Sequence, residues 1–398
     1  MNHRTGALAA ALAAALARQL TATPTSAPRL GYHPPEARAM TRSTHSLLSG
    51  RDGAQSGAAT EADNRRRWDG TSPGHYEVWY LTCNHRPSRT GYWIRYTLES
   101  PLPGHGDPYC QLWFAHFDRG DPRRNFAINH RLPIAAMGAA DAPFAITLGD
   151  ARLTHDSMSG VLVGGGHEAR WDLRWLPALV THHHLPDVMY QRGGLGETTV
   201  LSPNLSVPVS GEIEVDGRLH AMVAEPGGQT HLWGRRHAHQ WGWGHCNAFE
   251  GRPRAAFEAL TVRLERLGVV LPPLTIAALH LDGELLAFNQ FRHTLRNRGT
   301  MGTGSYRLDA EGPLARLHAE FTCRPEDMVV AEYADPDGAP SYCANTEVGT
   351  LDLLVERRGL TGWREAARLH SPFGGHFEVG ARVRDPAIAR DHRTVPAP

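Results

Sequence analysis

The 398-residue sequence lacks the features that identify several large classes of protein. Its 41 basic and 41 acidic residues balance, so no excess of positive charge predicts binding to nucleic acid or to an anionic membrane surface. The five cysteines are odd in number and form no C-x-x-C pair, which argues against a disulfide framework and a cysteine zinc ribbon. No G-x-x-x-x-G-K-[ST] or G-x-S-x-G motif occurs, and no helix is expected after the glycines at 164–166, which argues against a dinucleotide site.

Long apolar runs are also missing. The alanine–leucine stretch at 7–17 is too short and too weakly apolar to cross a bilayer, so we expect no integral membrane segment. Residues 1–27 are compatible with a secretory signal, which would direct the chain to the periplasm or out of the cell. The alternatives are an alanine-rich helix or an extension ahead of a start at Met40; both leave a cytoplasmic protein, the location that we expect. Residues 1–70 are therefore predicted to be a disordered lead-in or a targeting segment.

From about residue 74 the sequence consists of short segments that alternate apolar and polar residues. They recur roughly every 8–15 residues, and turn signals such as Asp216–Gly217 separate them, which favours an antiparallel barrel or sandwich. A closed barrel needs about eight strands. Two runs of similar strand content, 74–250 and 251–385, therefore predict an all-β fold of two antiparallel β-barrel domains, followed by a tail at 386–398.

The most informative stretch is HLWGRRHAHQWGWGHCNAF, residues 231–249. Its alternate residues are large on one face and mostly small on the other, which is typical of extended strands. We expect one strand near 229–234, a bend at 234–238 and a second strand at 239–249. The large face consists of His231, Trp233, Arg235, His237, His239, Trp241, Trp243, His245, Asn247 and Phe249.

Three interpretations of this face remain open. Indole and imidazole rings could line a ligand or catalytic cavity, or could fill the protein interior as packing. The His237-x-His239 pair could also bind metal with His231 or His245 as a third ligand. With 24 histidines in the chain, chance pairs are common, so we predict no metal and no cofactor. The adjacent histidines 182–184 cannot all face one way on a strand, and we expect them in a loop.

The segment WGWGHCNAF, residues 241–249, resembles the W-x-W-x-x-C-N-x-F element of tocopherol-cyclase-like proteins, and GGQTHLWG before it resembles their approach to that element. YADPDGAPSYCANTEVGTLDLLVERR and GGHFEVGARVRDP look like the closing lipocalin-like domain of the wider group, which includes AttH-like and hydroxyneurosporene-synthase-like proteins. The resemblance covers about residues 74–385. It implies two lipocalin-like barrels packed together, an apolar pocket and cofactor-free chemistry, such as water addition to a polyene or ring closure of a prenylated quinol.

Such chemistry begins with protonation of an alkene by a positioned acid in a dry cavity that aromatic faces line. The candidate catalytic residues are His237, His239, His245 and, if burial raises its pKa, Glu347. The candidate substrate-binding residues are His231, Trp233, Trp241, Trp243, Asn247 and Tyr342. Tyr342 and Glu347 are five residues apart, so on a regular strand they would face opposite ways.

We therefore expect a cyclase, hydratase or isomerase that acts on an apolar, terpenoid- or polyketide-like small molecule. The alternative is a non-catalytic carrier for such a molecule. A protonatable group that faces the cavity would distinguish the two hypotheses. No motif bears on the oligomeric state.

Overall fold

The computed structural model describes residues 61–186, 190, 197–294 and 296–395, all of which belong to one compact unit, 50–398. The predicted targeting segment and most of the predicted lead-in lie outside the described residues. The described end of the lead-in is ordered, because the backbone N–H groups of Arg67 and Trp68 donate to the buried Glu77 carboxylate at 2.7 and 2.9 Å. None of the described helices is long and apolar enough to cross a membrane.

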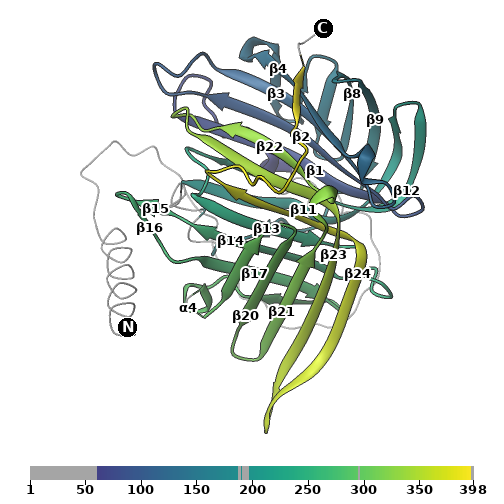
Figure 1. Ribbon diagram of the computed structural model, residues 1–398, viewed down its shortest axis with the longest axis vertical. Coiled ribbons are helices and arrows are strands. Elements are labelled where there is room, and N and C mark those ends of the chain that lie inside the picture. The colour runs from purple at the N-terminus through teal and green to yellow at the C-terminus, as the bar shows by residue number, and fades with distance from the viewer. Residues whose placement is uncertain (1–60, 187–189, 191–196, 295, 396–398) are drawn as a thin grey trace, which may run out of the picture. The chain divides into compact units, whose positions relative to one another are not determined.

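The all-β prediction is confirmed, and the described strands form two large sheets (Figure 1). The first sheet contains thirteen strands: β1 (His75–His85), β2 (Thr90–Ser100), β3 (Tyr109–Asp118), β4 (Phe126–Pro133), β5 (Met137–Asp141), β6 (Phe144–Leu148), β7 (Ala151–Thr154), β8 (Ser157–Gly164), β9 (His167–Trp175), β10 (His182–His183), β11 (Thr198–Val215), β12 (Arg218–Gly234) and β25 (Arg393–Val395). Their order is β25-β4-β3-β2-β1-β12-β11-β9-β8-β7-β6-β5, with β10 paired to β11. Every pairing is antiparallel except that of β25 with β4.

The second sheet contains ten strands: β13 (Gln240–Cys246), β14 (Ala256–Arg263), β17 (Leu274–Leu281), β18 (Glu284–Ala287), β19 (Arg298–Gly302), β20 (Ser305–Glu311), β21 (Ala315–Thr322), β22 (Val329–Ala334), β23 (Pro340–Gly359) and β24 (Gly362–Ala381). Their order is β18-β17-β14-β13-β24-β23-β21-β20-β19, with β22 paired to β23, and the long β23–β24 hairpin is visible at the yellow-green end of Figure 1. The small elements are β15 (Glu265–Arg266), β16 (Val269–Val270), α4 (Phe291–Thr294), η1 (Pro122–Arg124), η2 (Ile134–Ala136) and η3 (Pro325–Asp327).

Neither sheet closes on itself among the described strands. The hydrogen-bonded path of the first sheet ends at β25 and β5, and that of the second ends at β18 and β19. The prediction of two closed barrels is therefore corrected to two open sheets. The predicted domain boundary at 250/251 stays a prediction, but the chain changes sheet earlier, between Gly234 and Gln240.

The described apolar side chains form three clusters. Alternate residues of a strand point to opposite faces, so one strand can contribute to two of them. One cluster fills the first sheet and contains Trp79 and Phe114, and a second fills the second sheet and contains Phe321. A third joins the two sheets, and in it Trp243 of β13 meets Tyr80 of β1 with ring centroids 5.8 Å apart. The two opposite faces of β1 therefore pack into two different clusters, Trp79 into the first and Tyr80 into the third.

The face of β13 that carries small residues is covered by side chains of the second core, which leave no room for larger ones. The predicted bend is confirmed, since β12 ends at Gly234 and β13 begins at Gln240, and the second strand ends at Cys246, before the predicted end at 249. A Cβ on Gly242 would lie 2.7 Å from the Met301 side chain, and a Cβ on Gly244 would overlap the Phe321 ring. Glycine is required at both positions because aromatic and thioether side chains of the second core occupy that space.

Replacing Gly244 by alanine should therefore destabilise the fold. Overpacking of a filled core costs about 1–3 kcal/mol, and we expect Gly244→Ala to lower the free energy of unfolding by that amount in chemical denaturation. Gly302→Ala is the matched control, because a Cβ there meets only the Ser305 hydroxyl at 3.4 Å. Equal stabilities of the two variants would contradict this account of β13.

Candidate functional site

A cleft of about 1320 Å³ lies beside β10, β11 and β18. Its walls are mainly apolar and come from both sheets, for example Leu205 and Val207 of β11, Phe249 after β13, Leu285 of β18 and Phe373 of β24. Ligand pockets for small molecules typically measure about 300–1,000 Å³ and combine apolar walls with a few polar groups. The cleft is therefore large enough for a sizeable apolar molecule.

The polar groups on the wall of the cleft include His182, Asn247, His280 and Asn289. Asn247 is buried, and its Nδ2 donates to the carbonyl oxygen of Gly227 at 2.8 Å. Its Oδ1 has no hydrogen-bond partner among the described residues, so that oxygen remains able to accept a hydrogen bond. Of the predicted site residues, Asn247 alone belongs to the described lining of the cleft.

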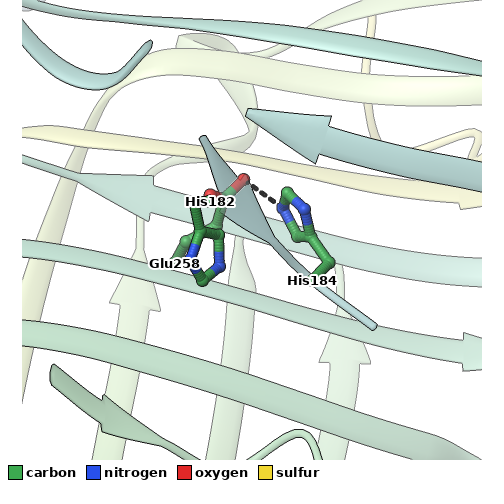
Figure 2. Close-up of side chains that lie close together, drawn as sticks. All are labelled: His182, His184 and Glu258. Carbon is green, nitrogen blue, oxygen red and sulfur yellow. Dashed lines mark ion pairs between the residues drawn. The ribbon is translucent and has the colours of Figure 1, made fainter. Parts of the chain in front are cut away.

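A second, much smaller cavity of about 10 Å³ adjoins this wall, and His182 and Asn289 border both spaces. His182, His184 and Glu258 converge there, with one ligand atom of each within 4.8 Å of the others (Figure 2). His182 and His184 come from β10 and the residue after it, and Glu258 comes from β14. The sequence prediction placed these histidines in a loop. The prediction overlooked that His182 and His184 are two residues apart, so their side chains can point to the same face of an extended segment.

Glu258 is fully buried yet well supported. Trp243 Nε1 donates to its Oε1 at 2.8 Å, Ser202 Oγ donates to its Oε2 at 3.2 Å, and His184 Nε2 lies 2.7 Å from its Oε1. Burial acts to raise the pKa of Glu258, but the neighbouring imidazoles of His184 and His182 outweigh burial and hold that pKa below its usual range. Burial lowers the pKa of His182 to about 3, so its imidazole is neutral at physiological pH.

Two predicted acids, His245 and Glu347, belong to a buried polar cluster between the sheets. His245 Nε2 donates to the Leu205 carbonyl oxygen at 2.8 Å, and its Nδ1 lies 3.1 Å from Nδ1 of His376. His376 Nε2 in turn donates to Asn84 Oδ1 at 2.6 Å. Burial lowers the pKa values of His245 and His376.

Glu347 lies on the β1 side of this cluster. The Thr82 hydroxyl donates to its Oε2, and Asn84 Nδ2 donates to its backbone carbonyl oxygen at 2.8 Å. Its Oε1 has no hydrogen-bond partner among the described residues, and burial raises its pKa well above the ordinary value. Glu347 lies on the same face of β23 as Cys343 of the inter-sheet cluster and contacts Thr82 of β1, whereas Tyr342 packs against the second core, so the two residues face opposite ways as their spacing predicts. The condition set for Glu347, that burial raise its pKa, is met.

The other two predicted acids contact carboxylates and do not belong to the described lining of the cleft. His237 Nδ1 lies 2.6 Å from Asp335 Oδ1, and its ring stacks on Tyr76 at 4.5 Å. His239 Nδ1 lies 3.0 Å from Glu265 Oε2. Their catalytic roles stay predictions.

The remaining predicted residues have structural partners. His231 bridges Glu77 Oε1 at 2.9 Å and the Asp63 carbonyl oxygen at 2.7 Å. Trp233 lies under the Arg67 guanidinium, 4.9 Å from its ring centroid, and Trp241 Nε1 donates to Glu378 at 2.7 Å. The structure thus brings Trp243 and His245 close to Glu258. It also pairs His231 with Trp233, with ring centroids 4.8 Å apart, and His237 with Trp241, with ring centroids 5.5 Å apart.

Residues 196–381 match the tocopherol cyclase-like family model. The resemblance predicted from the sequence is thereby confirmed for this segment, and the match supports a cyclase-like function. The chain is also 29% identical over 343 residues to the uncharacterized protein Rv0493c of Mycobacterium tuberculosis strain H37Rv, and equally to MT0513 of strain CDC 1551; each alignment covers 83% of this chain and 95% of the relative.

Two solved structures are similar in fold. A putative AttH from Nitrosomonas europaea superposes with a TM-score of 0.48 at 14% identity, covering 78% of this chain and 93% of that one. Kievitone hydratase from Nectria haematococca superposes with a TM-score of 0.44 at 10% identity, covering 77% of this chain and 88% of that one.

The raised pKa of Glu347 makes stability depend on pH in a definite direction. The unfolded chain releases this proton in the ordinary carboxyl range whereas the folded chain keeps it, so rising pH favours unfolding. We expect wild type to lose stability relative to Glu347→Gln as pH rises above about 5, by up to about 1.4 kcal/mol per pH unit until the folded group ionises. Denaturant titrations across pH measure this difference.

The exposed Glu332→Gln variant is the control, and its stability should run parallel to wild type. Parallel curves for Glu347→Gln and wild type would show that Glu347 titrates alike in the folded and unfolded chains, and would refute the assignment.

Proposed function

We propose that this protein binds a largely apolar molecule in the cleft and catalyses a cyclase- or hydratase-type reaction on it. The observation that carries this proposal is the cleft of about 1320 Å³, whose mainly apolar walls come from both sheets and also carry polar groups such as Asn247 and His280. The match of residues 196–381 to tocopherol cyclase-like proteins supports the reaction type.

The polar groups of the cleft suit a substrate with a hydroxyl group. The free Oδ1 of Asn247 can accept a hydrogen bond from that hydroxyl and orient its oxygen towards a carbon–carbon double bond. Ring closure adds the substrate's own O–H across the double bond, and hydration adds the O–H of water. Both reactions balance without a redox partner. A terpenoid or polyketide-like molecule with a hydroxyl group fits these requirements.

One observation favours the alternative of a non-catalytic carrier. The predicted acids His237, His239, His245 and Glu347 are absent from the described lining of the cleft. Proton transfer in the cleft would then depend on other groups, such as the imidazole of His280, which borders it. A carrier would bind the same molecule and release it unchanged.

Filling the cleft should abolish binding. Ala287 of β18 is half-buried on the cleft wall, and an indole there would occupy the ligand's space. We expect Ala287→Trp to weaken binding of the polarity-sensitive dye Nile red, and of a prenylated hydroquinone competing with it, by more than about 10-fold. Ala366→Trp, at an exposed position of β24 outside the described cleft lining, should bind as wild type does.

Turnover separates the enzyme from the carrier. Incubation of wild type with the prenylated hydroquinone, followed by chromatography and mass spectrometry, should give either an isomer of unchanged mass or a product heavier by one water. Binding that Ala287→Trp abolishes, with the hydroquinone recovered unchanged, would favour the carrier. Equal binding by both tryptophan variants would remove the cleft as the ligand site.

A further inference from the structure

We propose that His182, His184 and Glu258 form a binding site for a divalent transition-metal ion, best suited to zinc, in the wall of the cleft. Two imidazoles and one carboxylate are a ligand set that zinc accepts, and their ligand atoms already lie within 4.8 Å of one another (Figure 2). Ligands at about 2.0–2.1 Å from a tetrahedral zinc are about 3.3 Å apart, so small side-chain rotations complete the geometry.

The hydrogen bonding of His184 indicates that a partner is needed there. Its side chain is 2% exposed, and neither ring nitrogen makes a hydrogen bond among the described residues. Buried polar atoms in folded proteins are nearly always paired. Nε2 lies 2.7 Å from Glu258 Oε1, but the two groups do not meet in hydrogen-bonding geometry. A cation between them would satisfy both atoms.

A simple ion pair explains these contacts less well. A protonated His184 has two N–H groups, and each would need an acceptor in this buried site. Nδ1 has none among the described residues, and Nε2 is misaligned with its only near neighbour. A neutral imidazole that binds metal through Nε2 leaves one N–H unpaired instead of two.

The surroundings provide space for the ion and support for its ligand. The cavity of about 10 Å³ beside these side chains is close to the volume that one water-sized sphere needs. Trp243 Nε1 and Ser202 Oγ donate to the Glu258 carboxylate and fix its orientation, as outer partners do in metal sites. His182 and Asn289 border both this cavity and the cleft, so the fourth position of the ion would face the ligand space.

The role of this open position rests on the proposed function. Three protein ligands and one open position are the pattern of catalytic zinc sites, where the ion binds water or a substrate oxygen. The ion would bind the hydroxyl of the substrate or the water that adds to it. Metal binding itself does not depend on that role and can be measured without a substrate.

The test is zinc binding by the full chain. Wild-type protein is treated with chelator, dialysed and titrated with zinc chloride by calorimetry, and with cobalt(II) by absorption spectroscopy. We expect one equivalent of zinc and the intense visible bands of tetrahedral cobalt. His182→Ala and His184→Ala should each weaken zinc binding by more than about 100-fold, since loss of even an outer partner costs about 10–100-fold.

His183→Ala is the matched control, because His183 lies between the two ligands in sequence and stacks on Tyr190 instead, at 4.4 Å. It should bind zinc as wild type does. Glu258→Gln preserves the shape of the buried side chain, and its loss of zinc binding would show a ligand effect even if an alanine variant unfolds. Zinc should raise the melting temperature of wild type and His183→Ala only.

Absence of stoichiometric zinc in wild type would overturn the proposal, as would unchanged binding in the folded Glu258→Gln variant. Zinc binding without binding of Nile red or the hydroquinone would support the metal site and refute the proposed function. Binding of those apolar probes by a protein that does not bind zinc would support the cleft as a ligand site and refute the metal site.

Discussion

Burial of carboxylates where the two sheets meet is the constraint on which the candidate site depends. A charged group loses several kcal/mol of hydration in a protein interior unless partners replace it. Glu258 retains its charge because an indole N–H, a hydroxyl and an imidazole surround it. Glu347, with a hydroxyl contact to Thr82 and one oxygen without a partner, has a raised pKa instead. The same burial thus gives one carboxylate suited to a cation and one suited to hold a proton.

The period-two pattern was sufficient to predict which residues share a face, but not what that face contacts. It placed Trp241, Trp243 and His245 together, and it located the bend before Gln240. Alternation along one strand carries no information on whether the large face turns to its own sheet's interior or to another sheet. Here it turns to the other sheet, where Trp243 meets Tyr80, and the predicted cavity lining is largely inter-sheet packing.

The candidate metal residues escaped prediction for a related reason. Three adjacent histidines were assigned to a loop because they cannot all point one way, yet the first and third can. Their partner Glu258 lies far along the chain on β14. Long-range contacts of this kind come from strand pairing between distant segments, which one sequence does not specify. Asn247 was found because it shares a motif with its neighbours.

Packing also explains why the cleft lies where the sheets meet instead of inside either one. Phe321 and Met301 press on the glycines of β13, and Trp79, Phe114 and their neighbours fill the first sheet, so the described cores leave little internal volume. The described cleft lies where Leu205 and Val207 of the first sheet share a wall with Leu285 and Phe373 of the second. The polar groups His182 of β10 and Asn247 after β13 reach this space from a short strand and a strand end, whereas its apolar wall also uses the interior of the long β11 and β24. Because the two cores are packed with apolar side chains, the candidate site lies between the sheets, where polar groups of both can contact one molecule.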